Sequence, residues 1–195
     1  MKGLFINYIK KMKSLNYQVK CKLMNAKYYN VPQSRQRVIF IGVRKDLGIE
    51  PSYPEGDKKL ITVREALVNV KNKTYTRRLA TVASNIWDKI KPGQNGTYYR
   101  KDYYMNTVKV NPDKPCPTIP KTIGGTGATL HWKEKRSLTI EEVKRLSSFP
   151  DNYKTIGSPV QQWARIGNSV PPLFMKAIAE HIRINILEKA VITNG

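Results

Sequence analysis

Apolar side chains recur at helical spacing near the start of the chain and at strand spacing directly afterwards. Residues 3–15 carry an apolar stripe opposite several lysines, which predicts an amphipathic helix. That stripe consists of Leu4, Phe5, Tyr8, Ile9, Met12 and Leu15. Val19, Cys21 and Leu23 then alternate with polar residues, which predicts a strand with one buried face. Residues 38–43 are almost uniformly apolar, which predicts a second strand covered on both faces.

The pattern becomes irregular in the middle of the chain and helical again near its end. Residues 48–57 are rich in Gly, Pro and Ser, which is typical of a passage between domains. Short helices, strands and loops are expected from there to about residue 132. Thr139, followed three residues later by Glu142, predicts a capping box at a helix start. The residues after the Pro171-Pro172 pair predict a last helix with a buried stripe, formed by Leu173, Phe174, Ala177, Ile178, His181 and Ile182.

The composition adds a large positive charge to this picture. The 195 residues include 35 Lys and Arg against 14 Asp and Glu, a formal net charge of +21. Such a surplus repels itself unless an anion neutralises it, so nucleic acid is the expected partner, ahead of an acidic protein or a membrane surface. The excess is concentrated in the first 135 residues, as expected if they build a nucleic-acid channel.

The cysteine and histidine content excludes several classes of protein. Cys21 and Cys116 are far apart, and only His131 and His181 accompany them, so neither a disulfide framework nor a zinc site is expected. No apolar run approaches the ~20 residues that a membrane span needs. We therefore expect no metal and no membrane partner, and a location in the cytoplasm or, in a eukaryote, in the nucleus.

Three sequence blocks stand in a fixed order along the chain. They read Pro32-Gln33-Ser34-Arg35-Gln36-Arg37, Arg136-Ser137-Leu138-Thr139 and Gly167-Asn168-Ser169-Val170-Pro171-Pro172. In this order and spacing they resemble the arginine motif, the Arg-x-Leu-Thr block and the Gly-Asn-Ser-Val-Pro-Pro block of the DNA (cytosine-5) methyltransferase family. The resemblance covers essentially the whole chain, with the family's target-recognition domain at residues 50–132.

The resemblance implies an α/β fold. It consists of part of the Rossmann-like sheet of an S-adenosylmethionine-dependent methyltransferase, with a small, irregular target-recognition domain inserted. Residues 1–49 are expected to belong to the catalytic domain and to hold a helix, two strands and the arginine motif. Residues 50–132 are expected to form the recognition domain. Residues 133–195 are expected to hold the Arg-x-Leu-Thr block and the helix that returns to the catalytic domain.

The resemblance also implies the chemistry. The target cytosine is flipped out of double-stranded DNA, a cysteine adds to ring carbon 6, and carbon 5 takes the methyl group of S-adenosyl-L-methionine. Arg37 is then expected to stabilise the negative charge that develops on the ring carbonyl, because a guanidinium is always charged. Arg35 is expected to orient the same pocket or to bind phosphate, since side chains at i and i+2 of a strand share a face.

Two further sets of contacts follow from the resemblance. The cofactor is expected to meet Asn168, Ser169 and Val170, together with backbone amides at the start of the last helix. The expected DNA contacts are Gln33, Arg35, Thr118, Lys121, Thr126 and Thr129. Arg136, Leu138, Thr139 and Arg145 are expected to pack one domain against another.

Several motifs of the family are missing from the sequence. It has no cofactor glycine loop, no Pro-Cys-Gln catalytic loop and no Glu-Asn-Val block. Its first residues, Met1-Lys2-Gly3-Leu4, resemble the residues that follow the Glu-Asn-Val block in members of the family. Cys116 also follows a proline, but its surroundings resemble the recognition domain, so it is not expected to be the nucleophile. We therefore expect the chain alone to be inactive and to need an N-terminal methyltransferase half, as a separate subunit or a missing segment, which completes the cofactor site.

Two other interpretations remain open at this point. The chain could be a non-catalytic basic DNA-binding module or an inactive truncated methylase. It could also be a fragment of a transfer-RNA cytosine methyltransferase, because positive charge alone does not distinguish RNA from DNA.

Overall fold

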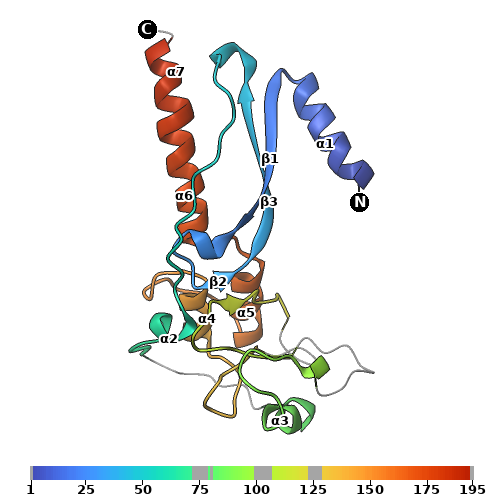
Figure 1. The fold of residues 1–195 in the computed structure, drawn as a ribbon, viewed down its shortest axis with the longest axis vertical. Coiled ribbons are helices and arrows are strands. Elements are labelled where there is room, and N and C mark those ends of the chain that lie inside the picture. The colour runs from blue at the N-terminus through green and yellow to red at the C-terminus, as the bar shows by residue number, and fades with distance from the viewer. Residues whose placement is uncertain (1, 72–78, 80, 99–106, 123–128, 194–195) are drawn as a thin grey trace.

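A computed structural model describes residues 2–71, 79, 81–98, 107–122 and 129–193 of the chain (Figure 1). The longer elements are α1 (Lys2–Ser14), β1 (Tyr17–Asn25), β3 (Gln36–Arg44), α3 (Thr81–Trp87), α4 (Ile140–Leu146), α5 (Pro159–Asn168), α6 (Pro172–Ile182) and α7 (Glu188–Thr193). The shorter ones are η1 (Ala26–Tyr28), β2 (Gln33–Ser34), η2 (Lys45–Leu47), α2 (Val63–Ala66), η3 (Gly96–Tyr98), β4 (Val108–Lys109), β5 (Cys116–Pro117), β6 (Thr129–Leu130) and the π-helical turn η4 (Arg183–Leu187). Helices and strands are thus combined, as expected for an α/β chain.

The strands β1 and β3 form a long antiparallel hairpin. Their register runs from Tyr17 opposite Arg44 to Asn25 opposite Gln36. One face of the hairpin is buried against α6, and the core on this face includes Met24, Ile41, Val43, Phe174 and Ile178. In Figure 1 this packing places the rod formed by α6, η4 and α7 along one side of the hairpin.

The opposite face of the hairpin is largely open. Leu23 and Val38 face each other across the strands and are 61% and 47% exposed. Phe40 meets Phe5 of α1 with a ring-centroid distance of 4.9 Å, yet both rings remain partly exposed. The predicted burial of residues 38–43 on both faces is therefore wrong, because within the described residues α1 covers only part of this side.

The predicted helix and first strand are confirmed, but their expected burial is not. In α1 the apolar residues Leu4 and Tyr8 are exposed, as is Leu15 directly after the helix, while Ile9 and Met12 are half-buried. Cys21, expected to lie in the core, is exposed on the open face of the hairpin. Periodicity gave the type of each element correctly, but it could not show what packs against it.

A second core lies below the hairpin and joins the middle of the chain to its C-terminal helices. Its buried residues are Val63, Val110, Cys116, Ile119, Leu138, Ile140, Val143, Leu146, Trp163 and Ile166. Two small parallel pairs, β2 with β5 and β4 with β6, border this core. The core extends across residue 132, where one expected domain ends and the next begins, because α4 and α5 pack with the middle segment. The three-domain division stays a prediction.

The predicted capping box at Thr139 is confirmed. The hydroxyl of Thr139 accepts from the amide of Glu142, and the Glu142 carboxylate accepts from the amide of Thr139 at 2.8 Å. Arg136 donates two hydrogen bonds to the same carboxylate, at 2.8 and 2.7 Å. The Arg-x-Leu-Thr block is thus a buried helix start, as its expected packing role requires.

Candidate functional site

The arginine motif and the Gly167–Pro172 block, two of the three sequence blocks, meet the middle segment of the chain at the side chain of Arg35, which is only 4% exposed. Its Nη1 donates to the carbonyl oxygen of Ile119 at 3.1 Å, and its Nη2 donates to the carbonyl oxygen of Gly167 at 2.7 Å. These acceptors lie 84 and 132 positions away along the chain. The arginine motif, the middle segment and the C-terminal block are therefore joined by one guanidinium group.

The segment 118–120 is held against this junction from two sides. The hydroxyl of Thr118 donates to the carbonyl of Ser34 at 2.8 Å, next to the parallel pairing of β2 with β5. From the other side, Nε1 of Trp163 in α5 donates to the carbonyl of Pro120 at 3.0 Å. The segment is thus fixed between β2 and α5.

Gly167 allows α5 to approach this segment closely. A Cβ built at Gly167 would lie 2.4 Å from the carbonyl oxygen of Pro120 and 2.9 Å from Cα of Lys121. Both neighbours are backbone atoms, which cannot swing away as a flexible side chain can. Only glycine therefore fits at this point of α5 without moving the backbone.

The charge of Arg35 is balanced weakly. Its two hydrogen-bond acceptors are neutral carbonyls, and its buried Nε has no partner among the described residues. Burial, and then the like charge of Arg37, lower the pKa of Arg35 to about 10. The group stays protonated at neutral pH, so the junction contains a buried positive charge close to a second one.

Arg37 differs from Arg35 in its exposure. It lies near the start of β3 and is half-buried, and its Nη1 donates to the carbonyl of Gln36 at 2.6 Å. Its guanidinium therefore remains accessible at the edge of the junction, whereas that of Arg35 is enclosed. Of the two arginines, Arg37 has the freedom to meet a bound molecule.

The residues expected to contact DNA differ in their exposure to solvent. Gln33 is 1% exposed, and its amide donates to the hydroxyl of Ser147 at 3.0 Å, so it lies inside the protein. Thr129 is likewise buried, in β6. Thr118 and Lys121 are exposed beside the junction. Thr126 lies outside the described residues.

The expected cofactor residues lie between α5 and α6. Asn168 ends α5 with an exposed side chain, and the hydroxyl of Ser169 donates to the carbonyl of Ile166 at 2.6 Å. Val170 is also exposed. An exposed amide beside an exposed apolar side chain fits the mixed polar and apolar surface of S-adenosyl-L-methionine.

The expected amides at the start of α6 are less available. Prolines occupy the cap position and the first position of the helix, and proline has no backbone N–H. The next amide, that of Leu173, donates to the hydroxyl of Ser148 at 3.2 Å. The helix α6 begins at the Pro171-Pro172 pair, as expected, but Gly167 and Asn168 ahead of it belong to α5, a helix that was not predicted.

Cys116 lies fully buried in the lower core. Burial raises the pKa of its thiol to about 12. A thiol in this state is protonated at neutral pH and cannot attack a bound base. The structure agrees with the expectation that Cys116 is not a nucleophile.

Sequence reasoning missed two residues that build the junction. Trp163 is buried and bonds the carbonyl of Pro120, and Ser147 bonds the buried amide of Gln33. A signal for Trp163 was available, because Ser158 and Gln161 form a capping box with Pro159 at the first helical position. No comparable local signal identifies Ser147, whose partner is 114 positions away.

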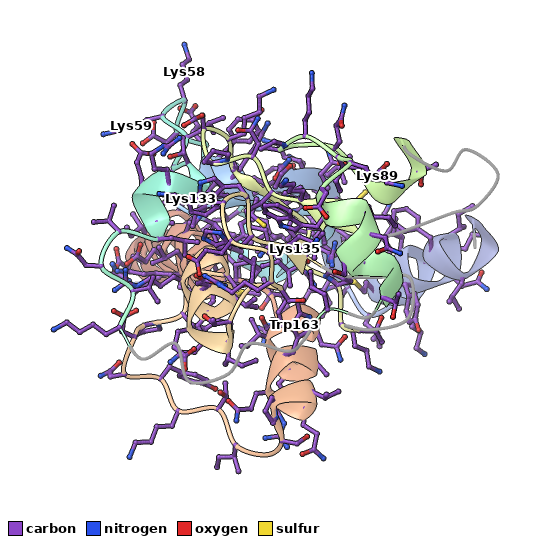
Figure 2. The ribbon with its side chains drawn as sticks, turned by 90° about the horizontal axis from the view of Figure 1, so that it is seen from below. Lys58, Lys59, Lys89, Lys133, Lys135 and Trp163 are labelled. Carbon is purple, nitrogen blue, oxygen red and sulfur yellow. The ribbon has the colours of Figure 1, made fainter. Side chains whose placement is uncertain are left out.

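The end of the molecule that carries α2 and α3 is basic. Figure 2 shows it from below, with exposed Lys58, Lys59, Lys89, Lys133 and Lys135. Lys135 forms an ion pair with Asp88. These five lysines define the basic end of the molecule.

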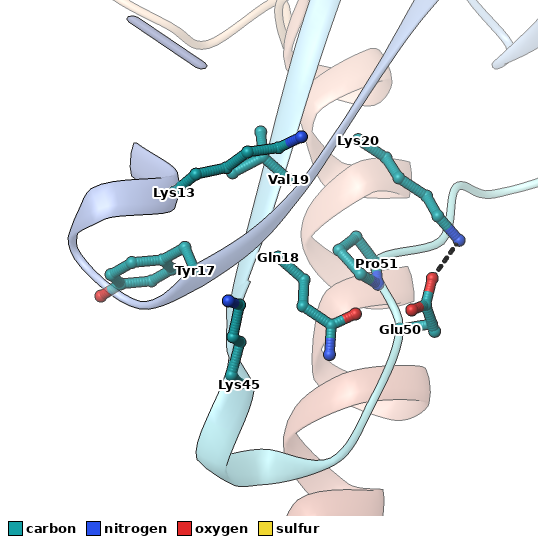
Figure 3. A pocket seen from close by; sticks show the side chains of 8 residues that line it. All are labelled: Lys13, Tyr17, Gln18, Val19, Lys20, Lys45, Glu50 and Pro51. Carbon is teal, nitrogen blue, oxygen red and sulfur yellow. Dashed lines mark ion pairs between the residues drawn. The ribbon is translucent and has the colours of Figure 1, made fainter. Parts of the chain in front are cut away.

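A separate pocket lies at the end of the hairpin where β1 begins and β3 ends (Figure 3). It has a volume of about 340 Å³ and is lined by Lys13, Tyr17, Gln18, Val19, Lys20, Lys45, Glu50 and Pro51. Lys20 and Glu50 form an ion pair across it at 2.6 Å. None of the residues that line this pocket belongs to the three sequence blocks.

The described residues contain no group of three His, Cys, Asp or Glu side chains that could hold a metal ion. Among these residues, no helix combines the length and the apolar character that crossing a membrane requires.

The chain is similar to a family of known proteins over most of its length. Residues 2–183 match the family described as C-5 cytosine-specific DNA methylase. The Type II methyltransferase M1.HphI of Haemophilus parahaemolyticus is 31% identical over 188 residues, which cover 86% of this chain and 48% of the relative. M.BbvI of Brevibacillus brevis is 34% identical over 171 residues, which cover 79% of this chain and 46% of the relative. The chain therefore spans about half the length of these relatives.

Solved structures with a similar fold include a prophage-encoded protein of E. coli described as a DNA modification methyltransferase. The TM-score is 0.70 at 18% identity, covering 89% of this chain and 62% of that one. The methyltransferase EhMeth of Entamoeba histolytica gives a TM-score of 0.56 at 18% identity, covering 98% of this chain and 58% of that one. Similarity at this level of identity establishes the fold alone.

Proposed function

The chain belongs to the C-5 cytosine-specific DNA methylase family, and we propose that it forms the C-terminal portion of a DNA cytosine-5 methyltransferase. The enzyme would transfer a methyl group to carbon 5 of a cytosine flipped out of double-stranded DNA. This portion would supply DNA recognition and part of the base and cofactor pockets. Such an enzyme would work at the nucleoid, in the cytoplasm of a bacterium or archaeon.

The junction at Arg35 is the observation that carries this proposal. One buried side chain bonds the segment next to Thr118 and the helix end next to Asn168. A reaction between a base and a cofactor needs the two bound side by side in a fixed geometry. Residues proposed for the two ligands are brought together by this arrangement.

Arg37 is the residue that we assign to the base. Its accessible guanidinium can donate to the ring carbonyl of a flipped cytosine and stabilise the negative charge that develops there. A preorganised donor of this kind is worth about 3–4 kcal/mol of transition-state stabilisation, or a hundredfold to a thousandfold in rate. Arg35, enclosed by carbonyls, would hold the pocket in shape without touching the base or a phosphate.

Asn168, Ser169 and Val170 would hold one side of the cofactor. S-adenosyl-L-methionine supplies the methyl group when it is bound. The amide of Asn168 would bond its polar part, and Val170 would pack against its apolar surface. The other side of the cofactor would be held by the N-terminal methyltransferase half.

The basic end would meet the phosphates of DNA, with Thr118 and Lys121 near the base pairs. Its five lysines are exposed, and so are Thr118 and Lys121. Contacts to phosphates position a protein on a duplex, and contacts in the groove give sequence specificity.

The open face of the hairpin supports a second half as partner. Exposed apolar side chains such as Leu23, Val38 and Phe40 are costly in water, since burying one of this kind is worth about 1.5–3 kcal/mol. We assign this face to the N-terminal methyltransferase half, whether it is a separate subunit or a preceding segment. That half would also bring the nucleophilic cysteine, because Cys116 is buried and protonated.

Methyl transfer from radiolabelled S-adenosyl-L-methionine to unmethylated plasmid DNA tests the proposal. We expect no transfer by the chain alone and transfer by the chain together with the N-terminal half, with bisulfite sequencing showing 5-methylcytosine. In the combined enzyme, Arg37→Ala should lower kcat a hundredfold or more, with a change in DNA affinity below about tenfold.

Other outcomes would count against parts of the proposal. Turnover by the chain alone would refute the need for a second half. Transfer to transfer RNA in place of DNA would refute the substrate. A non-catalytic DNA-binding module would show salt-sensitive DNA binding that Arg37→Ala weakens, and no methyl transfer in any combination.

A further inference from the structure

Arg35 bonds two segments to which the proposed function gives different ligands. The carbonyl of Ile119 directly follows Thr118, in the segment proposed to lie at DNA. The carbonyl of Gly167 directly precedes Asn168, the first residue proposed to meet the cofactor. This inference rests on the proposed function, because it concerns the relation between those two binding sites.

The guanidinium of Arg35, which bridges the carbonyls of Ile119 and Gly167, has little conformational freedom. A guanidinium is planar, and its two Nη groups are fixed relative to each other. Both bonds are buried, where a hydrogen bond is electrostatically stronger than in water. The positions of the two carbonyls relative to each other are therefore set by a single rigid group.

Direct packing strengthens this link. A Cβ at Gly167 would clash with the backbone of Pro120 and Lys121, so α5 lies close to this segment, and Trp163 of the same helix donates to the carbonyl of Pro120. A shift of a few tenths of an ångström in the end of α5 must therefore move the segment 119–121 or break these contacts.

The buried charge adds a reason for both bonds to form together. Arg35 has only two carbonyl acceptors within the described part of the chain, and Arg37 repels it. Losing either carbonyl would leave a buried cation still less well solvated. Ordering one segment in its bonded position thus favours the bonded position of the other.

We propose that Arg35 is a positioning residue that couples cofactor binding to DNA binding, so that a ligand at either site orders the other. Thermodynamic linkage requires the effect to be reciprocal: DNA raises the affinity for the cofactor by the factor by which the cofactor raises the affinity for DNA. Arg35 touches neither ligand and acts only through the two carbonyls.

Calorimetry on the complete enzyme, the chain with its N-terminal half, measures the coupling. The probe is S-adenosylhomocysteine, titrated with and without saturating unmethylated plasmid DNA. We expect DNA to tighten its binding by about fivefold or more in the unaltered enzyme, within the usual range of allosteric coupling. In Arg35→Lys the charge stays but the planar fork is lost, and the DNA effect should fall below about twofold.

Arg145→Lys is the matched control. Arg145 also donates to a carbonyl of a distant segment, that of Val68, and it pairs with Asp151, but it does not touch segment 118–121 or the end of α5. Its replacement removes an equally planar bridge and should leave the fivefold coupling in place. A general loss of rigidity would lower the coupling in both variants and would overturn the proposal.

Hydrogen exchange on the unaltered enzyme tests the same link without any substitution, in case Arg35→Lys does not fold. S-adenosylhomocysteine alone should slow exchange at the amides of Thr118, Ile119 and Lys121. Plasmid DNA alone should slow exchange at the amides of Gly167 and Asn168. Protection confined to each ligand's own segment would overturn the proposal.

The results separate this inference from the proposed function. An enzyme that methylates DNA and binds both ligands without coupling, or with equal coupling in Arg35→Lys, refutes the role of Arg35 alone. An enzyme that binds neither S-adenosylhomocysteine nor plasmid DNA refutes both proposals.

Discussion

Gly167 of α5 packs directly on the carbonyl oxygen of Pro120, at a distance that leaves no room for a side chain. A Cβ at position 167 would lie 2.4 Å from that oxygen and 2.7 Å from its carbon. Glycine in a helix normally costs about 0.5–1 kcal/mol relative to alanine. Here glycine lets the end of α5 approach the Pro120 segment closely, and in this position the Gly167 carbonyl accepts a hydrogen bond from Arg35.

Gly167→Ala should destabilise the protein although alanine is the better helix former. The backbone displacement costs about 1–3 kcal/mol, as overpacking does, and exceeds the gain in helix propensity. Gly3→Ala in α1 is the control, since its Cβ would meet nothing within 4 Å, and it should stabilise by up to about 1 kcal/mol. Urea unfolding measures both, and a Gly167→Ala variant as stable as the original would contradict this packing.

Acid should destabilise the helix start at Thr139 through Glu142, which is 2% exposed. Burial alone would raise the pKa of this carboxyl, but hydrogen bonds from Arg136 and Thr139 lower it below its usual value. A lowered folded pKa means that the stabilisation is fully present above the unfolded value near 4.5 and is lost as the pH falls through the folded one. Unfolding followed between pH 7 and pH 3 should show this loss.

Glu142→Gln should remove that part of the pH dependence. It should also cost about 3 kcal/mol at pH 7, because it leaves the largely enclosed guanidinium of Arg136 without the carboxylate of its main partner. The second capping box, Thr62 with Glu65, is the control, since its carboxylate is exposed. Glu65→Gln should have a much smaller effect, and equal effects of the two substitutions would contradict the importance of burial.

The two cysteines should differ in their reaction with iodoacetamide. Cys21 is exposed on the open hairpin face, and Cys116 is buried with a thiol pKa of about 12. In the chain without its N-terminal half, Cys21 should be alkylated at pH 7.5 while Cys116 stays unmodified until urea unfolds the protein. Mass spectrometry of the two peptides measures this, and rapid alkylation of native Cys116 would reopen its role as nucleophile.

The salt dependence of DNA binding should identify the face that meets phosphates. Lys133 belongs to the basic end, and its replacement in Lys133→Gln should weaken DNA binding and reduce the slope of log affinity against log salt by about one. Lys45 lines the pocket at the end of the hairpin where β1 begins and β3 ends, and Lys45→Gln should leave the slope unchanged. Fluorescence anisotropy with a duplex at several salt concentrations measures both, and the reverse ranking would place DNA at the other end.

Local signals were sufficient for much of the fold. The stripe in α1, the two apolar strands and the Thr139 capping box each depend on residues within a few positions of one another. The helix α5 was missed because Gly167 and Asn168 suggest a turn. Glycine is favoured in turns by its free backbone, and only the neighbouring Pro120 backbone explains its presence inside a helix.

The sequence predicted which residues belong to the candidate site, but not which of them are exposed. The resemblance brought Arg35, Arg37 and Asn168 into one list, and the structure brings their segments into one place. Gln33 and Thr129 were expected at DNA but are buried, because exposure depends on distant parts of the chain. A sequence motif names residue types at fixed spacing, and it does not say which of them faces solvent.

Residue order alone thus determined the family, the elements with a clear period and the strong positive charge, since each is a property of neighbouring residues or of their sum. The family resemblance gave the two arginines of the arginine motif different expected roles, but the sequence could not show which of the two side chains is buried. Only the tertiary structure did so, by enclosing Arg35 between carbonyls 84 and 132 positions away while leaving Arg37 accessible. Contacts across such separations form when the chain packs, and no local pattern encodes them.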